Sequence, residues 1–171
     1  TCHLGNGCSM AAIQNGKVID TTMGMTPLEG LVMGTRCGDI DPAVVLRLAE
    51  LGIPTPEIDK ILNKKSGLLG VSGKVSDMRD LVTACEGGDK QAELALNMFV
   101  RRVVKYIGSY HVLLGHTDAI VFTGGIGEYS NAVRGRVVSS LKALGISLDA
   151  AANDKFRGKA GIISTEDSKL K

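Results

Sequence analysis

One long amphipathic segment dominates the chain and limits the folds open to it. Between Asp89 and Leu114, apolar or aromatic side chains recur every three or four residues, at Ala92, Ala95, Leu96, Phe99, Val100, Val103, Ile107, Tyr110 and Leu114. This spacing is typical of a helix with one buried face. Polar residues four apart mark the opposite face, at Glu93, Asn97, Arg101 and Lys105. At ~1.5 Å per residue the helix is about 39 Å long, so it belongs to the core of a larger body.

Short apolar runs on either side of this helix predict a sheet. Asn15-Gly16 is a strong hairpin signal between two strand-like runs. The expected strands are Cys2–Leu4, Ser9–Ile13, Lys17–Thr21, Ala119–Thr123, which we expect to be buried, and Gly161–Ser164. Strands first, followed by alternating helices and strands, indicate an α/β layered domain with a mixed sheet and flanking helices.

Capping signals place shorter helices between these elements. The expected helices are Asp41–Leu51, Thr55–Asn63, Ser76–Cys85 with Ser76 as N-cap, and Ser130–Leu144. Two glycine-bearing segments are predicted to be connectors: 22–41 lacks periodicity and should form a loop or a short helix with loops, and 66–74 is the second. A loop as long as the first of these in a compact domain is usually functional.

Composition excludes several classes of function. The 171 residues suffice for one domain with a real core. A net charge of +2 and an aromatic content of 4% give no support to nucleic-acid binding. No apolar run is long enough to cross a membrane, and the opening Thr1-Cys2-His3 does not look like a signal peptide. The four cysteines lack metal-ligand spacing, so we expect free thiols, no metal site built from them and a cytoplasmic protein.

Glycine is over-represented, with 22 residues, and it gathers where a backbone could approach a ligand. The strand-like run Ile120–Thr123 leads into Gly124-Gly125-Ile126-Gly127 and then a helix. Such a turn at the carboxyl end of a strand can hold a nucleotide, because free N–H groups there attract anions. A tight turn without a ligand remains the alternative, since neither a GxGxxG nor a P-loop pattern is present.

Two further segments carry polar groups beside glycines. His3-Leu4-Gly5-Asn6-Gly7 follows a strand and could form a nest of N–H donors for phosphate oxygens, or merely a hairpin-like turn. Arg36 lies between Gly34 and Gly38, where a guanidinium has room to bind phosphate or carboxylate oxygens bidentately. A surface ion pair of Arg36 with Asp39 or Asp41 is the alternative.

Asp77 and Arg79 begin a short predicted helix and could touch a nucleoside. Helix capping and a surface ion pair are the other interpretation. Cys37 beside Arg36 could be an activated thiol, but no histidine lies close in sequence.

Taken together, four blocks of this sequence closely resemble the acetate kinase family, with propionate kinase as a near sibling. They stand in family order and cover nearly the whole chain: His3–Gly7, Asp20–Arg36 (DTTMGMTPLEGLVMGTR), Ser66–Gly70 (SGLLG) and Phe122–Glu128 (FTGGIGE). The resemblance implies a ribonuclease-H-like domain of the acetate and sugar kinase, actin and hexokinase superfamily. Residues 1–171 then form most of the C-terminal, nucleotide-side domain of a two-domain kinase, with the N-terminal domain and the extreme C-terminus outside the sequence.

The same resemblance implies reversible phosphoryl transfer between ATP and acetate, giving acetyl phosphate and ADP, with Mg²⁺ and a homodimer formed through this domain. It assigns nucleotide and phosphate binding to His3, Leu4, Gly5, Asn6, Gly7, Asp77, Met78, Arg79, Gly125, Ile126, Gly127, Glu128 and Tyr129. Arg36 matches the catalytic arginine and Pro27 a residue of the acyl pocket. No metal ligand is assigned within the chain.

Three positions depart from the family pattern. Tyr129 stands where Asn is usual, Cys37 follows the arginine in place of Ser, and Cys8 stands where Gly or Ser is common. We expect the two glycine turns and Arg36 to converge on one polyphosphate. The isolated fragment is expected to be inactive as a kinase, and a non-catalytic nucleotide-binding or dimerisation module is the alternative.

Overall fold

The computed structural model describes residues 1–171 in full. The chain divides into two compact units, one formed by Thr1–Thr22 with Val100–Lys171 and the other by Met23–Phe99. The expectation that the whole chain is most of one larger domain stays a prediction.

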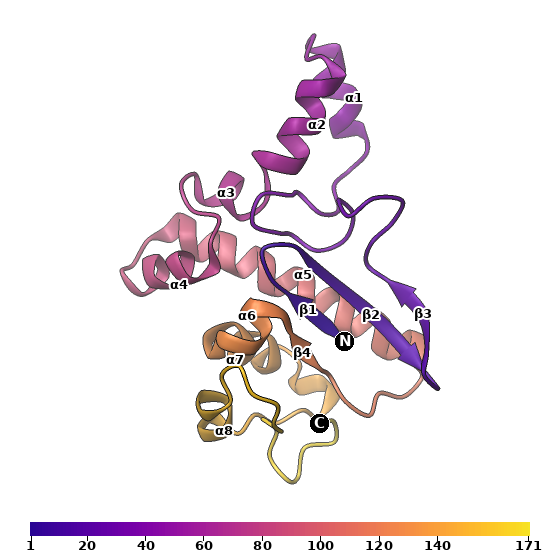
Figure 1. Ribbon diagram of the computed structural model, residues 1–171, viewed down its shortest axis with the longest axis vertical. Helices are drawn as coiled ribbons and strands as arrows, with labels where there is room; N and C mark the ends of the chain where they lie inside the picture. Colours follow the sequence, from indigo (N-terminus) through magenta and orange to yellow (C-terminus); the bar gives the residue numbers. More distant parts are fainter. The chain divides into compact units, whose positions relative to one another are not determined.

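The first unit is built on a four-stranded mixed sheet (Figure 1). Its strands are β1 (Cys2–Leu4), β2 (Cys8–Gln14), β3 (Lys17–Thr21) and β4 (Phe122–Thr123), in the order β3-β2-β1-β4. β1 pairs antiparallel with β2 and parallel with β4. The predicted α/β fold with a mixed sheet and flanking helices is therefore confirmed.

Burial along the strands follows their alternation. Cys8, Met10 and Ala12 of β2 are buried, whereas every residue of the edge strand β3 is exposed. β4 is shorter than the predicted strand Ala119–Thr123, and both of its residues are only half-buried. The predicted strand Gly161–Ser164 is wrong, because only Ser164 makes a bridge, to Leu148.

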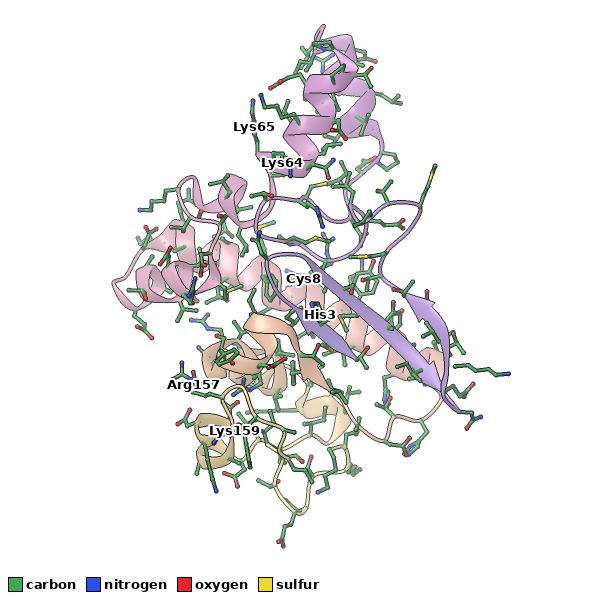
Figure 2. All side chains as sticks on the ribbon, viewed as in Figure 1. His3, Cys8, Lys64, Lys65, Arg157 and Lys159 are labelled. Carbon is green, nitrogen blue, oxygen red and sulfur yellow. The ribbon has the colours of Figure 1, made fainter.

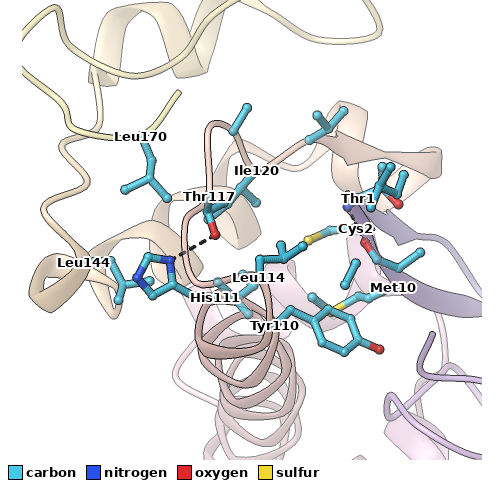
Figure 3. Close-up of a pocket in the computed structure, with 16 residues that line it drawn as sticks. Thr1, Cys2, Met10, Tyr110, His111, Leu114, Thr117, Ile120, Leu144 and Leu170 are labelled. Atoms are coloured by element: carbon cyan, nitrogen blue, oxygen red, sulfur yellow. Dashed lines mark hydrogen bonds between the residues drawn. The ribbon is translucent and has the colours of Figure 1, made fainter. Parts of the chain in front are cut away.

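The long helix α5 (Lys90–Leu114) confirms the periodicity argument. Phe99, Val103 and Ile107 are 1%, 0% and 5% exposed, so the predicted face is buried. The helix begins in the second unit and continues into the first. There its last turns pass behind the sheet, and Tyr110 lines one cavity together with Cys2 of β1 (Figures 1 and 3).

After β4 the chain forms α6 (Gly124–Tyr129), α7 (Asn131–Ser139), a short 3-10 helix (Lys142–Leu144) and α8 (Ala150–Lys155). The predicted turn over 124–127 is corrected to helix α6. Glycine has a low helix propensity, but contacts of this segment with β1 and β4 override it. The predicted helix Ser130–Leu144 divides into α7 and the 3-10 helix, with Ser130 accepting a hydrogen bond from the Val133 amide.

The second unit consists of a long irregular loop and four helices before α5. These are α1 (Ala43–Glu50), α2 (Thr55–Lys64), α3 (Gly67–Ser72) and α4 (Met78–Glu86). Two expectations are corrected: the connector 66–74 contains α3, and the N-cap of α4 is Asp77 rather than Ser76. The loop is packed by its own apolar centre at Leu31, Val32 and Met33, which are buried.

Helix α1 differs from the other α-helices because none of its residues is buried. Its aliphatic side chains include Val44 at 44% and Leu46 at 66% exposure, and Leu51 just beyond its end is 61% exposed. No helix of the chain combines the length and apolarity that crossing a membrane requires.

Candidate functional site

The first predicted phosphate turn lies directly after β1. His3 projects from the strand, and its Nδ1 atom lies 3.0 Å from Oγ1 of Thr123 at the end of β4. The turn itself is closed by Cys8, whose thiol donates to the Gly5 carbonyl oxygen over 2.9 Å. Figure 2 shows His3 and Cys8 at the two ends of this turn. Asn6 and Gly7 are exposed at its tip, as residues that meet a ligand need to be.

The second predicted segment begins where β4 ends and lies against β1. Gly124 has a φ angle of +77°, and a Cβ atom placed on it would lie 2.6 Å from the carbonyl oxygen of Leu4. Only glycine allows this backbone conformation and this close approach together. Because β1 and β4 are parallel neighbours, their carboxyl ends present the 5–7 turn and α6 at the same edge of the sheet.

The amino end of α6 already has an acidic partner. The Gly124 amide donates to Oε1 of Glu128, one turn later in the same helix, over 3.2 Å. A carboxylate at this position satisfies an amide that has no partner within the helix. One N–H that the sequence offers to a phosphate is therefore occupied by Glu128, and a phosphate bound there would have to displace this side chain.

A cavity of about 550 Å³ adjoins α6 and is lined by Gly127 and Glu128, among other residues. Thr123, Arg134 and Lys159 also line it. None of the residues His3–Gly7 lines this cavity. The cavity thus includes part of the predicted adenosine-side loop but not the predicted phosphate turn.

The second cavity, of about 190 Å³, is unrelated to the predicted residues (Figure 3). It is mostly apolar and lies between β1, β2 and the last turns of α5. One of its polar contacts joins Nδ1 of His111 to Oγ1 of Thr117 over 3.0 Å. No residue that the sequence assigned to a ligand lines it.

One residue of the first unit was missed by the sequence reasoning. Arg134 of α7 is 2% exposed, and its guanidinium donates to carbonyl oxygens of Gly127 and Glu128, both over 2.8 Å. Burial is the main cause that lowers the pKa of Arg134, and the nearby charge of Arg157 lowers it further. Only a weak signal was available in the sequence. Arg134 directly follows the apolar Val133, and both residues are buried.

In the second unit, Arg36 lies in the loop that docks on α3. A Cβ atom on Gly67 would meet the carbonyl oxygens of Met33 and Arg36, so the loop backbone lies directly on the start of this helix. Amides at the start of α3 donate to the loop, Ser66 to Thr35 over 3.0 Å and Leu68 to Met33 over 2.9 Å. The loop backbone around Arg36 is therefore fixed by neighbouring structure.

The Arg36 guanidinium has no carboxylate partner. Its Nη1 contacts Sδ of Met33 at 3.7 Å, and no ion pair involves it. Asp39 accepts instead from the Gly30 amide over 2.8 Å, and Asp41 accepts from the Ala43 amide over 2.9 Å. The alternative of an ion pair with Asp39 or Asp41 is therefore not what the structure shows, and the guanidinium keeps its capacity for an anion.

Asp77 and Arg79 bind each other. The Asp77 carboxylate accepts from the Arg79 amide over 2.8 Å and from its guanidinium over 3.0 and 2.7 Å. The side-chain hydrogen bonds from Arg79 are the main cause that lowers the pKa of Asp77 to about 2. Both features of the alternative interpretation, a helix cap and a surface ion pair, are present. Met78 between them is buried, so its side chain is part of the core.

The structure thus places the starts of the two segments side by side in one unit, through the contacts of Leu4 with Gly124 and of His3 with Thr123. Arg36, Pro27 and Asp77–Arg79 belong to the other unit, and their convergence with the glycine turns stays a prediction. Pro27 is exposed on the long loop. No group of three or more His, Cys, Asp or Glu residues in the chain could hold a metal ion.

Solved structures match this architecture closely. A crystal structure of Porphyromonas gingivalis acetate kinase matches with a TM-score of 0.94 and 46% identity, over 99% of this chain and 43% of that one. A propionate kinase from Francisella tularensis matches with a TM-score of 0.92 and 44% identity, over 98% of this chain and 43% of that one. The sheet and these matches define an α/β domain of the actin and hexokinase type.

Sequence comparison then gives the family. The acetate kinase of Clostridium novyi is 56% identical over 172 residues, covering 100% of this chain and 43% of the relative. That of Dictyoglomus thermophilum is 58% identical over 171 residues, covering 99% of this chain and 43% of the relative. The family model described as the acetokinase family matches residues 1–171. The chain belongs to the acetokinase family, and it spans about 43% of the length of these relatives.

Proposed function

We propose that this chain supplies the nucleotide and phosphate-binding half of an enzyme that transfers a phosphoryl group reversibly between ATP and acetate. The observation that carries the proposal is the packing of Gly124 on Leu4, which joins two glycine-rich segments at the carboxyl ends of neighbouring parallel strands. Membership of the acetokinase family supports the reaction class.

The roles of the residues follow from what phosphoryl transfer demands. The reaction needs positioned phosphates and neutralised charge more than covalent chemistry from the protein. In this proposal the His3–Gly7 turn and the Gly125–Tyr129 segment hold the nucleotide phosphates and the adenosine side. Arg36, fixed at its backbone and without a carboxylate partner, binds the oxygens of the transferred group. An arginine in such a role contributes roughly 10³–10⁵ in rate.

Mg²⁺ belongs to the proposal through the nucleotide. The chain's own side chains do not form a group of three ligands, so they do not fit a site held by protein alone. Mg²⁺ in phosphoryl-transfer sites is commonly held by substrate phosphates with one or two carboxylates. No carboxylate of this chain is assigned as a ligand of that Mg²⁺ ion.

The two candidate functions, transfer to acetate and transfer to propionate, differ in their acyl substrate. A propionate kinase is among the matching structures, at 44% identity, so transfer to propionate is the runner-up. Pro27 is the residue of this chain that we place at the acyl methyl group. A larger acyl group needs more room beside Pro27, and the ratio of kcat/KM for acetate and propionate decides between them.

Association and location complete the proposal. We propose a homodimer that forms through this part of the protein, with no nucleic-acid or membrane partner. The cysteines Cys2, Cys8, Cys37 and Cys85 form no disulfide, which supports a reducing compartment such as the cytoplasm. The fragment alone is proposed to bind nucleotide or to dimerise without catalysing transfer, since it spans only about 43% of the length of its relatives.

Two measurements test the proposal. The full-length protein is expected to form acetyl phosphate from ATP and acetate, trapped as the hydroxamate, and the 171-residue chain is expected to bind ADP in calorimetry without forming it. Turnover by the purified chain would contradict the division of roles. Absence of ADP binding together with absence of activity in the full-length protein would contradict the function itself.

A further inference from the structure

Arg134 occupies a position unlike any other cation of the chain. It lies on α7, is 2% exposed, and directs its guanidinium between α6 and α8, which flank α7 (Figure 1). Nη1 donates to the carbonyl oxygens of Gly127 and Glu128, both over 2.8 Å. The other side of the guanidinium bonds Asn153, from Nε to Oδ1 over 2.8 Å and from Nη2 to its carbonyl oxygen over 2.6 Å.

A last bond, from Nη2 to the Phe156 carbonyl oxygen over 3.2 Å, completes the set. Arginine has five N–H donors, and the five hydrogen bonds use this capacity in full. Four of the acceptors are backbone carbonyls and none is a carboxylate. Burying a guanidinium costs free energy unless its donors are satisfied. The complete set of hydrogen bonds offsets this cost and holds the Arg134 side chain in place.

The carbonyls that Arg134 binds on α6 are the ones a helix cannot satisfy by itself. The last carbonyls of any helix lack an intrahelical partner, and positive charge is favourable beside them. Two further donors come from the loop after α8: the Gly158 amide bonds Glu128 over 3.3 Å, and Nε of Arg157 bonds Tyr129 over 3.2 Å. Figure 2 shows Arg157 and Lys159 on this loop.

Helix α6 depends on these partners. It has six residues, three of them glycine, which is far below the length at which a helix is stable alone. Its amino end is held by the close contact of Gly124 with Leu4. Its carboxyl end is held by Arg134, so the segment between them is fixed at both ends.

From this arrangement we infer that Arg134 is a positioning residue that fixes the Gly125–Tyr129 segment in the conformation that binds nucleotide. The inference rests on the proposed function, because it assigns a consequence for nucleotide binding at that site. Arg134 itself does not contact the nucleotide in this inference. It acts through the carbonyls of Gly127 and Glu128, and thereby sets where the backbone of the loop lies.

The test uses the full-length protein with Arg134→Met, Arg134→Lys and a matched control, Arg101→Met. Arg101 lies on the exposed face of α5 and takes part in none of the contacts described. We expect Arg134→Met to raise the KM for ATP by at least about tenfold, with the KM for acetate within about twofold of wild type. Amide exchange of residues 125–129 is expected to accelerate, while exchange in the core of α5 stays unchanged. Arg101→Met is expected to change neither.

Chemical rescue adds a readout that a merely structural role would not give. In Arg134→Ala, millimolar methylguanidinium is expected to restore protection of residues 125–129 and to lower the KM for ATP. Arg134→Lys has one ammonium group in place of the planar guanidinium. Its KM for ATP and its amide exchange at residues 125–129 are expected to lie between those of wild type and Arg134→Met.

Several outcomes would overturn the inference. Unchanged KM for ATP and unchanged exchange in a folded Arg134→Met protein would show that α6 holds itself. Loss of the whole fold in both Arg134→Met and Arg134→Lys would show that Arg134 supports the domain rather than the loop. If the wild type neither binds ADP nor turns over, the proposed function fails, whereas exchange of residues 125–129 still decides whether Arg134 holds α6.

Discussion

Replacing Gly124 by alanine tests the contact that joins the two glycine-rich segments. The added Cβ would lie 2.6 Å from the Leu4 carbonyl oxygen, against 3.4 Å for an ordinary contact, and the opposing atom is backbone. The strand and the start of α6 therefore have to separate by several tenths of an ångström. Overpacking of this kind costs about 1–3 kcal/mol. The left-handed backbone at φ +77° adds about 1–2 kcal/mol for a residue with a side chain.

We therefore expect Gly124→Ala to lower the free energy of unfolding by about 2–5 kcal/mol. For a chain of this size each kcal/mol lowers Tm by roughly 2–4 °C, so a large drop is expected in thermal unfolding followed by circular dichroism. Urea titration of the same samples gives the free energy independently. ADP affinity is expected to fall as well, because the displaced segment is the proposed binding loop.

The adjacent glycine provides the control. A Cβ atom on Gly125 would meet nothing within 4 Å, and its φ angle is not positive. Alanine there is expected to leave stability unchanged or raise it by up to about 1 kcal/mol through helix propensity. Equal stability of Gly124→Ala and Gly125→Ala would refute the reasoning, because it would mean that Gly124 is not tightly packed on β1.

Three further predictions concern single side chains. Arg36→Ala in the full-length protein is expected to lower kcat by at least about 10²-fold, since an anion clamp is lost; a near-normal rate in steady-state assays would contradict this role. The lowered pKa of Asp77, about 2, means that its ionised form stabilises the fold above about pH 4 and that this contribution is lost as pH falls toward 2. Asp77→Asn, which keeps the cap, is therefore expected to cost a few tenths to 1 kcal/mol at neutral pH, with the difference in Tm closing on acidification; a difference independent of pH would contradict it. Burial raises the pKa of Cys2 to about 11, so this thiol is expected to react with a disulfide reagent at pH 8 only after unfolding, and rapid labelling of the native chain, located by mass spectrometry, would disagree.

The elements that the sequence predicted correctly were those with a sustained local signal. The long periodic face of α5 and the Asn15-Gly16 hairpin need little tertiary context, and both formed as expected. The parallel pairing of β1 with β4, by contrast, was not predicted and is known from the structure.

The elements that were missed depend on contacts distant in sequence. Helices α3 and α6 contain glycine, which lowers helix propensity, yet each is held by partners elsewhere in its unit. Gly161–Ser164 had the apolar pattern of a strand but lacks a neighbour to pair with beyond the bridge at Ser164.

The candidate site shows the same division. Residue types and spacing singled out the 3–7 turn, the 124–127 glycines and Arg36, because glycines and an arginine carry recognisable chemistry, and the family resemblance extended the second segment to Tyr129. The contacts of Arg134 and Glu128 could not be derived in this way. The Arg134 guanidinium donates to two α6 carbonyls, and the Glu128 carboxylate accepts from the Gly124 amide of its own helix. Both contacts depend on where the backbone lies. The bond between Asp77 and Arg79 is present, as one of two interpretations expected, while a nucleoside contact of these residues stays a prediction.

The exposure of helix α1 determines where the chain is expected to unfold first. A helix without a single buried residue gains little from the core, since only Val45 and Leu48 are half-buried, so its amides are protected mainly by marginal local hydrogen bonding. It is expected to open and close independently, many times for each global unfolding event, and to offer the first sites for a protease. Its exposed valine and leucine side chains would then be presented in an extended conformation, which makes 43–51 the segment where self-association on storage is expected to begin.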